Sequence, residues 1–450
     1  MTKEEELQAL REENRALKAL VAELLPLKEH LAQANARIKE LEERLAKDSR
    51  TSSKPPSSDG LARLPRRSRR PSGKRPGGQA GHPGHTLSMM EPPDEVVRHR
   101  PTVCRQCRED LSAVPGRVAE RRQVLDVPEI RLLAHEHQIE AICCPTCHTT
   151  SLGSFPASVS APVQYGPNMQ ALAVYLHQGQ LLPTARTCEA LAAICGCHIS
   201  EATLLQWSEL AAERLAPTVE RIAELIVASR LQHGDETGIR VYGMLHWLHV
   251  NCTRYLTHLT WHASRGREAM DEIGIWPRFD GRGMHDRLVS YDGYGCAHSI
   301  CGAHLGRDCA GVAEQDHQQW AVEMQDFLLD LHDACHEFRL LHLTSVPPIE
   351  RDDWVARYFE ILAAGYAAQP PPPASSSAKR KGRRKQSKGK NLLDALLLRA
   401  EQVLALLDDL RIPFTNNQAE RDLRWAKVQQ KISGTFRSAT GVTAFCRIQS

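Results

Sequence analysis

The chain has 450 residues, with 57 Lys and Arg against 54 Asp and Glu and a formal net charge of +3. This length predicts two to four domains rather than a single compact one. It contains no run of 18 consecutive apolar residues, and its first residues, MTKEEELQALREEN, are highly charged, so we expect neither a membrane span nor a secretory signal and infer a cytoplasmic protein.

Residues 1–48 carry a heptad pattern of apolar side chains. These recur every seven residues, at Leu10, Leu17, Leu24, Leu31, Ile38 and Leu45. The spacing is typical of the d positions of a left-handed coiled coil, so we expect a zipper that joins copies of the chain into a homo-oligomer. The a positions are weaker, since they include Asn14 and Lys28, and Pro26 is expected to kink or split the helix. An amphipathic helix that folds on its own domain is the alternative.

Residues 49–90 are rich in Ser, Pro, Gly and Arg. This composition cannot bury enough apolar surface to order itself, so we expect a basic disordered linker. Between residues 63 and 75 it has seven Arg or Lys and no acid, which suits contact with DNA phosphates. The residues assigned to DNA binding here are Arg66, Arg67, Arg69, Arg70, Lys74 and Arg75. A solvated tether is the alternative.

Residues 91–155 contain two CxxC pairs, Cys104 with Cys107 and Cys144 with Cys147. Fourteen cysteines are too few for a disulfide scaffold, and their clustering here favours metal binding. Two such pairs present four thiolates to one tetrahedral Zn²⁺, so we predict a structural zinc ribbon. Cys143 competes with Cys144 for a place in that site.

Residues 156–228 have a helical pattern, in which CEALAAICGCHISEATLLQW resembles a helix-turn-helix. An apolar helix is followed by a turn at Gly196 and by Ser200 as the cap of a second helix. A plain helical hairpin is the alternative, since no basic side chain lies between residues 199 and 210.

Residues 229–300 are expected to form the first part of an α/β domain. The pattern predicts strands at 232–241, 244–252 and 255–262, a helix near 266–274 and a strand at 287–291. The three strands would form an antiparallel meander, and this order of elements is the one with which a ribonuclease H-like sheet begins.

Residues 301–410 indicate a mainly helical insertion, and residues 411–450 the second part of the domain. The insertion contains a basic low-complexity loop at 369–390, which includes eight Arg or Lys and no acid between residues 379 and 390. Removing the fifteen basic residues of this segment and of 63–75 leaves 42 basic against 54 acidic residues. Affinity for polyanions is therefore concentrated in two segments.

Three carboxylates far apart in the sequence are candidates for a common site: Asp235, Asp292 and Glu420. Asp235 lies in an alternating stretch with His233 and Ile239 on its own face, and Asp292 follows a short apolar run, so both are expected at or near strand ends. His304 and Arg307 are expected to pack beside this site, although Cys301 and His304 together have the spacing of a metal pair.

Glu420 lies just inside a predicted helix whose start is marked by Thr415, Asn416 and Asn417, residues that can cap first-turn amides. Helical spacing places three basic residues on its face, Arg424, Lys427 and Lys431. An acid at the head of a basic stripe suits a phosphodiester whose cleavage needs a metal and whose flanks need cations.

The segments HGDET, SYDGY, CGAH and PFTNNQAERDLRWAKVQQKISGTFRS, together with SSKPPSSDG, GGQAGHPGHT and the CxxC pairs, occur in this order. Together they closely resemble the transposases of the insertion sequence 66 family of bacterial mobile elements. The resemblance implies a DDE triad of Asp235, Asp292 and Glu420 that holds Mg²⁺ or Mn²⁺ on a ribonuclease H-like fold. It also implies cleavage at the element ends, 3′-OH strand transfer into target DNA, and companion proteins encoded by the same element.

The expected fold class is therefore a multidomain protein of mixed α and α/β structure, associated with the bacterial nucleoid. Relatives continue beyond the final residues CRIQS, and Thr415 stands where they have Asp. A truncated or inactive DNA-binding derivative is one alternative, and a metal-dependent nuclease that cuts without joining is another. Strand transfer from pre-cut DNA ends separates the transposase from the nuclease, and any Mg²⁺-dependent cleavage separates both from the inactive derivative.

Overall fold

The computed structural model describes residues 3–46, 77, 81, 86–369 and 386–450. Beyond helix α1, its described residues divide into two compact units. Residues 168–184 and 202–450 form the sheet unit, and residues 86–167 and 185–201 belong to the cysteine unit. No described helix is both long enough and apolar enough to cross a membrane.

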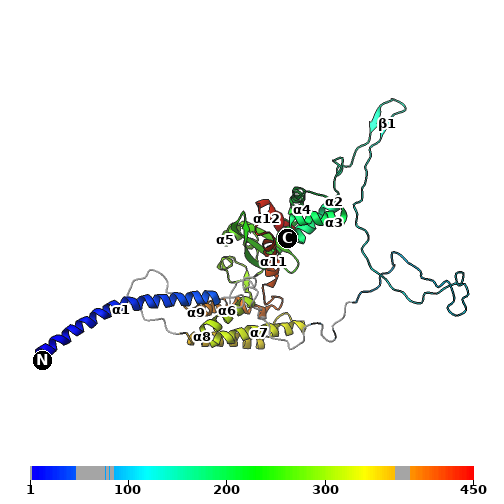
Figure 1. The fold of residues 1–450 in the computed structure, drawn as a ribbon. Helices are drawn as coiled ribbons and strands as arrows, with labels where there is room; N and C mark the ends of the chain where they lie inside the picture. The colour runs from blue at the N-terminus through cyan, green and yellow to red at the C-terminus, as the bar shows by residue number, and fades with distance from the viewer. Residues whose placement is uncertain (1–2, 47–76, 78–80, 82–85, 370–385) are drawn as a thin grey trace. The chain divides into compact units, whose positions relative to one another are not determined.

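Helix α1 (Lys3–Ala46) is continuous through Pro26, so of the expected kink or split the split is wrong (Figure 1). Proline removes one helical hydrogen bond, and the flanking sequence, rich in Leu, Ala, Glu and Lys, has high helix propensity on both sides. Leu17, Leu31 and Ile38 are 55%, 63% and 52% exposed. These described d positions are therefore free to meet a second helix, and pairing between copies stays a prediction.

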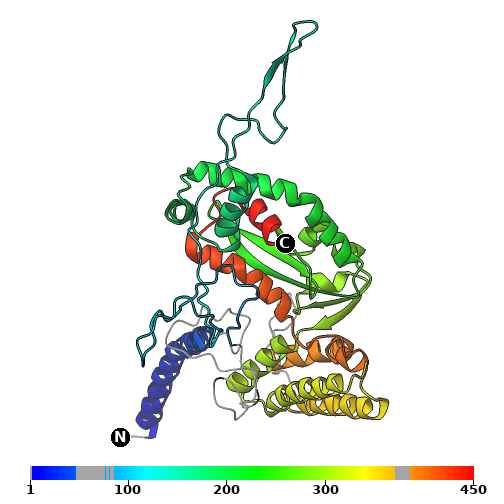
Figure 2. The same ribbon diagram turned by 90° about the vertical axis from the view of Figure 1, so that its right-hand side faces the viewer.

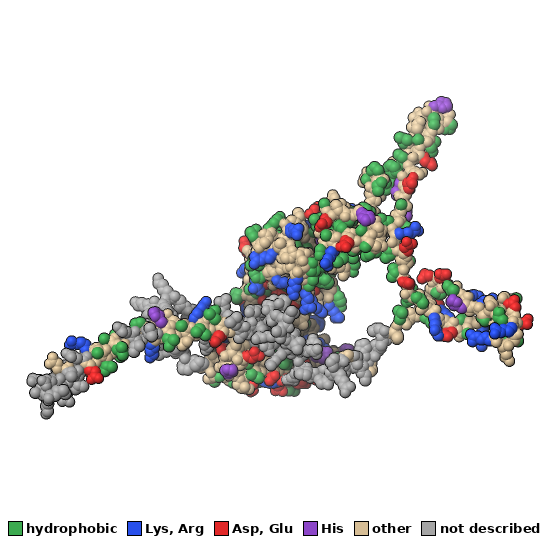
Figure 3. Space-filling model, in the orientation of Figure 1, with side chains coloured by type: hydrophobic (Ala, Val, Ile, Leu, Met, Phe, Trp, Pro, Cys, Tyr) green, Lys and Arg blue, Asp and Glu red, His purple; other side chains and the backbone are tan. Residues whose placement is uncertain are grey.

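The cysteine unit has little regular structure. Strands β1 (Ala141–Cys143) and β2 (Thr150–Leu152) form an antiparallel hairpin, and helix α3 (Thr184–Cys195) ends at Gly196, whose φ is +69°. The turn expected at Gly196 is confirmed. Hydrophobic side chains lie at the surface of this unit (Figure 3), with Val124 at 91% exposure.

The sheet unit is built on a five-stranded mixed sheet. After α2 (Pro167–Val174), η2 (Tyr175–Gly179) and α4 (Glu201–Val227), the chain enters β3 (Leu231–Val241), β4 (Met244–Cys252), β5 (Thr257–His262), β6 (Arg282–His285) and β7 (Ala297–Ile300). The order across the sheet is β5-β4-β3-β6-β7; β3, β4 and β5 are antiparallel, and β6 and β7 run parallel to β3. The predicted meander is confirmed.

The β3–β4 hairpin closes through Tyr242 and Gly243, which have φ values of +52° and +76°. Two residues of positive φ give a turn whose twist matches that of paired strands, and glycine adopts this conformation without steric cost.

The strand predicted at 287–291 is wrong. Residues Val289–Gly293 form the short helix η4, and Val289 is 74% exposed. The strand lies earlier, as β6, because the Asp286 carboxylate accepts the Leu288 amide at 2.8 Å and turns the chain. Gly283 within β6 lies under Trp276, where a Cβ would come within 2.4 Å of the indole. A strand with such close packing lacks the β-branched residues that identify strands in sequence.

Helices cover both faces of the sheet (Figure 2). On one face, α11 (Asn417–Ser433) and α12 (Ala439–Gln449) pack Ala419, Leu423 and Phe445 against Ile239 and Val250. On the other face lie α5 (Arg267–Ile273), η3 (Trp276–Arg278) and η4, with Met270, Trp276 and Tyr291 buried. The helix expected near 266–274 is confirmed.

Between β7 and α11 the chain forms a helical insertion, as predicted. Its helices are α6 (Gly302–Asp316), α7 (Gln319–Leu340), α8 (Pro348–Ala367), α9 (Lys388–Leu398) and α10 (Ala400–Asp408). They share a core that includes Phe327, Tyr358 and Leu393. Most of the basic loop expected at 369–390 lies outside the described residues, but residues 388–390 belong to α9, so the loop ends earlier than predicted.

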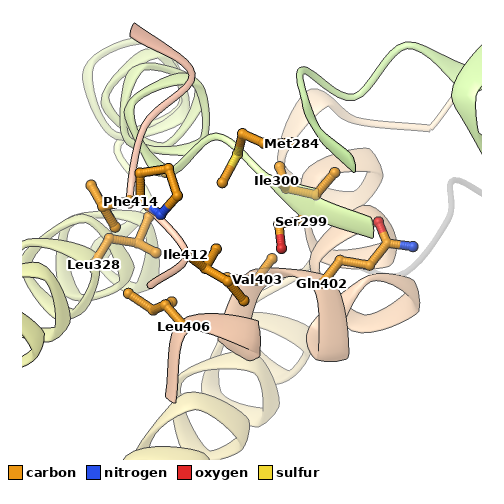
Figure 4. A pocket seen from close by; sticks show the side chains of 11 residues that line it. Met284, Ser299, Ile300, Leu328, Gln402, Val403, Leu406, Ile412 and Phe414 are labelled. Atoms are coloured by element: carbon orange, nitrogen blue, oxygen red, sulfur yellow. The ribbon is translucent and has the colours of Figure 1, made fainter. Parts of the chain in front are cut away.

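A small apolar pocket lies where the ends of β6 and β7 meet α7 and α10 (Figure 4). Met284, Ile300, Leu328, Leu406 and Phe414 contribute most of its wall. None of the lining side chains is ionisable, so this pocket is a packing gap between sheet and insertion rather than a catalytic site.

Candidate active site

The register between β3 and β6 places two carboxylates at one level of the sheet. His233 pairs with Met284, and continuing this parallel register by two residues sets Asp235 beside Asp286, the residue after the end of β6. Neighbouring parallel strands present residues of one level to the same face. Asp286 accordingly acts on the Asp235 carboxyl as a nearby negative charge.

Helix α11 brings Glu420 to the same pair, because Asn416 fastens its start to β3. The Asn416 amide donates to the Gly234 carbonyl at 2.9 Å, its Oδ1 is 2.9 Å from His233 Nδ1, and its backbone N–H donates to Cys301 Sγ at 3.2 Å. The expected helix start is confirmed, but the capping role of Asn416 is wrong, since its side chain makes no cap bond. A buried amide is better satisfied by strand β3 than by solvent-exposed helix amides.

The pKa of Asp235 is raised well above its usual range. Burial is the largest cause, followed by the negative charges of Glu236, Asp286 and Glu420. Carboxylates crowded in this way resist ionisation unless a cation joins them.

Glu236 is buried on the opposite face of β3. It accepts a hydrogen bond from the Tyr291 hydroxyl and lies 3.4 Å from the Arg265 guanidinium. Burial raises its pKa to about 7. The Arg265 guanidinium also lies 3.6 Å from the Asp286 carboxylate, so this one cation is close to both Glu236 and Asp286.

Helix α6 brings further polar groups to Glu420. His304 Nδ1 lies 3.7 Å and an Arg307 guanidinium nitrogen 3.8 Å from Glu420 Oε1. Glu420 Oε1, His304 Nδ1 and Arg307 Nε are all buried without a hydrogen-bond partner. His304 and Arg307 therefore lie beside the site as expected, and burial and Arg307 lower the pKa of His304 to about 4, which keeps its imidazole neutral.

Cys301 Sγ joins His304 and Glu420 in a cluster whose ligand atoms lie within 4.8 Å of one another, the single such group of three among the described residues. The pKa of the Cys301 thiol is raised to about 11 by burial. Glu420, from α11, thus joins Cys301 and His304 as a third group. The Cys301 sulfur remains a thiol and accepts a hydrogen bond from the Asn416 backbone N–H.

Asp292 has a different environment. It lies in η4, and its two carboxylate oxygens accept hydrogen bonds from the Arg399 guanidinium at 2.6 and 2.5 Å. Arg399, between α9 and α10, is 8% exposed at its side chain. The expected position of Asp292 at or near a strand end is wrong, because the predicted strand is absent and Asp292 lies within η4. Its bidentate pair with Arg399 ties it to the insertion. The geometry favours Asp286, which follows β6 by one residue and which no periodicity in the sequence marked.

The basic residues of α11 are not equivalent. Arg424 and Lys431 are exposed. Lys427 Nζ instead donates to the Gly238 carbonyl at 2.6 Å, and burial lowers its pKa. Lys427 therefore fixes α11 to β3, which the helical periodicity alone did not reveal. The basic residues assigned between 66 and 75 lie outside the described residues.

The two CxxC pairs adopt the same turn. Cys104 N–H donates to the Glu109 carbonyl at 2.8 Å, and Cys144 N–H donates to the Thr149 carbonyl at 2.9 Å. In each turn the residue after the second cysteine has positive φ, +64° at Arg108 and +55° at His148. The turns match each other, but the pairs do not bring three ligand atoms together within the described residues.

The second pair is disposed to ligate through Cys144 rather than Cys143. Cys143 lies in strand β1, outside the turn. The Thr149 hydroxyl, as the largest cause, lowers the pKa of Cys147 to about 7, which favours the thiolate that a metal requires.

Asp235, Asp286 and Glu420 supply the oxygen donors that a divalent cation takes, although their ligand atoms do not all lie within 4.8 Å of one another. Mg²⁺ takes hard oxygen ligands and retains several waters, so two or three carboxylates suffice. The raised pKa of Asp235 and the unpartnered Glu420 Oε1 are both features that a bound cation and its waters would satisfy.

Comparison with protein families gives two matches. The model of the family described as "Transposase IS66 family" matches residues 162–444, which is more than half of the chain. The model of a family of unknown function matches residues 2–88. No curated protein matches the chain.

Proposed function

The chain belongs to the IS66 family of transposases and is therefore a DNA-processing enzyme of transposition, and we propose that Asp235, Asp286 and Glu420 form its metal-binding catalytic site. The observation that carries this proposal is the register that sets Asp286 beside Asp235, with Glu420 among the charges acting on Asp235. We also propose that the reaction is cleavage at the element ends followed by 3′-OH strand transfer.

The sheet supports a ribonuclease H-like interpretation of the catalytic domain. Its first three strands form an antiparallel meander, and two further strands add in parallel beside the first. The proposed acids come from the central strand, from the end of its parallel neighbour and from a helix that packs on the sheet. The three acids thus come from different elements of one sheet unit, and such rigid elements can hold a catalytic site precisely.

When bound, a pair of divalent ions would activate the attacking water or 3′-hydroxyl and stabilise charge at the phosphorus. The chain's own residues would set the geometry. Asp235 is held in the central strand, and Asn416 fixes the start of α11 and so the position of Glu420. Arg307, close to Glu420, would place a positive charge beside the phosphate.

We include zinc binding, oligomerisation, DNA affinity and companion proteins in the same proposal. The matching cysteine turns support one structural Zn²⁺ bound by Cys104, Cys107, Cys144 and Cys147. The exposed d positions of α1 support a homo-oligomer, and the basic segments would supply sequence-independent affinity for DNA. Companion proteins of the same element are expected partners.

The test uses the full chain with oligonucleotide duplexes that carry pre-cut 3′ ends, in Mg²⁺ or Mn²⁺. We expect joined products, and we expect Asp235→Asn and Glu420→Gln to reduce joining at least a hundredfold while DNA binding persists. Asp422→Asn is the control, because its carboxylate accepts the Thr257 hydroxyl at 2.9 Å and is turned toward β5. Cleavage without joining would identify a nuclease, and binding without either reaction would identify an inactive derivative.

A further inference from the structure

We propose that the outer face of α11 binds unpaired DNA next to the scissile bond, with a nucleobase stacked on the Trp425 indole. This face is defined by six residues: Arg421, Arg424, Trp425, Val428, Lys431 and Ile432. The inference rests on the proposed function, since it places the DNA strand beside Glu420.

The apolar residues of this face lie at the surface. Trp425 is 46% exposed, Val428 37% and Ile432 45%. Their spacing of three and four residues makes one continuous stripe, opposite the side on which Ala419 and Leu423 are buried against the sheet. Single exposed hydrophobic side chains are ordinary, but a stripe with a large aromatic at its head indicates a surface that meets a partner.

The charged side chains on this face of α11 are all positive. Arg421, Arg424 and Lys431 are exposed on it. Asp422, the acid nearest in sequence, has its carboxylate on Thr257 and Gln418 rather than on this face. Lys427 is also directed away, to the Gly238 carbonyl.

This combination identifies the partner as single-stranded nucleic acid. Grooves that hold single strands combine cations along the backbone with aromatic side chains on which bases stack. A protein partner at an apolar helix face would favour a larger apolar core with charged residues at its rim. Here the cations interleave with the apolar residues along the helix.

The position along the helix matches a strand that runs from the active site. Trp425 follows Glu420 by five residues, a rise of roughly 7.5 Å with a rotation of about 140° around the helix axis, and Lys431 follows it by eleven, a rise of roughly 16 Å with a rotation of about 20°. At about 3.4 Å per nucleotide along a strand, these distances correspond to roughly two and five nucleotides. A strand that passes around the helix from Glu420 would therefore bring a base near the cleaved end to the indole and the following phosphates to Lys431.

The experiment measures binding in EDTA, so that no chemistry occurs. The probes are a blunt 20-bp duplex and the same duplex with a five-nucleotide single-stranded tail containing 2-aminopurine. We expect the wild-type chain to prefer the tailed duplex and to change the 2-aminopurine fluorescence. Trp425→Ala should reduce this preference about tenfold and abolish the fluorescence change, since stacking contributes about 1–3 kcal/mol per base. Trp425→Phe should retain most of both.

The matched control is Tyr255→Ala, which removes an aromatic that is 82% exposed on the β4–β5 turn and should leave tail binding unchanged. Wild-type tail preference and fluorescence in a folded Trp425→Ala would overturn the proposal. A lower sedimentation mass with unchanged DNA binding would also overturn it, because the face would then join copies of the chain. Strand transfer by Asp235→Asn would contradict the proposed function. The tail-binding measurement in EDTA involves no catalysis, so it tests the Trp425 proposal separately.

Discussion

Asp286 stands level with Asp235 across the parallel strands β3 and β6, one residue beyond the last residue of β6. Asp292, six residues later, instead accepts hydrogen bonds from the two terminal guanidinium nitrogens of Arg399. The two acids lie in one short segment, RGMHDRLVSYDGY, yet the structure gives them different partners.

Asp286→Asn should reduce Mg²⁺-dependent strand transfer at least a hundredfold with little change in stability, since it removes a charge that metal binding needs. Asp292→Asn should retain activity within about tenfold but lower the free energy of unfolding by about 1–3 kcal/mol, because it leaves the buried Arg399 without its anion. Strand-transfer rates and chemical denaturation check both. An inactive but fully stable Asp292→Asn beside an active Asp286→Asn would restore Asp292 as the second acid.

Asn416→Ala should lower the free energy of unfolding by about 2–3 kcal/mol, since it leaves the Gly234 carbonyl and His233 without their partner. It should also reduce strand transfer without altering any proposed catalytic carboxylate, because the start of α11 loses its attachment to β3. Asn417→Ala, at the adjacent exposed position, is the matched control. Equal stability and activity of the two variants would show that α11 is held by its apolar face alone.

Stability should depend on pH through His249, whose Nε2 lies 3.1 Å from the Ser264 carbonyl. Burial lowers its pKa to about 4, so the folded chain disfavours the charged imidazole. The contribution of neutral His249 to the free energy of unfolding is complete above the pKa of about 6.5 in the unfolded chain. As pH falls from there toward 4, this contribution is lost, by up to about 3 kcal/mol. Denaturation midpoints measured from pH 7.5 to 4 should therefore fall less steeply for His249→Gln than for the wild type. Parallel curves would exclude His249 as the cause.

Metal analysis should find one Zn²⁺ for each chain, because the two cysteine turns have matching geometry and thiolate sites couple metal binding to folding. Cys104→Ser and Cys144→Ser should each reduce zinc content to less than half an equivalent. Cys143→Ser, whose sulfur lies outside the turn, should retain it. Retention of zinc by Cys104→Ser would rule out the four-cysteine site.

Deletion of residues 1–48 should lower the oligomeric state in sedimentation, since Leu17, Leu31 and Ile38 are exposed in the single chain and pairing with a second helix would bury them. Replacement of these three by Gln in the full chain should have the same effect without shortening it. Replacement of the exposed Gln8, Arg15 and Gln33 by Ala serves as the control. A mass that stays constant in the Gln variant would show that α1 does not join the copies.

Local patterns in the sequence predicted several elements correctly. Alternation in HGDETGIRV identified β3 and the face that Asp235 shares with Ile239, because strand periodicity is a property of consecutive residues. The helix that carries Glu420 and the helical insertion also follow from residues within one segment. Each of these depends on short-range geometry that the side chains themselves record.

Only the tertiary structure places Asp286 level with Asp235. Strand β6 is short and contains a glycine that fits under Trp276, so no periodicity marks it, and its register with β3 depends on packing between distant segments. Tertiary packing also decides the bonds of Asn416 and Lys427. The sequence predicted Asn416 as a helix cap and Lys427 as a DNA contact, but both side chains donate hydrogen bonds to carbonyls of β3. Such roles depend on which buried partner needs a hydrogen bond, and that partner exists only once the chain has folded.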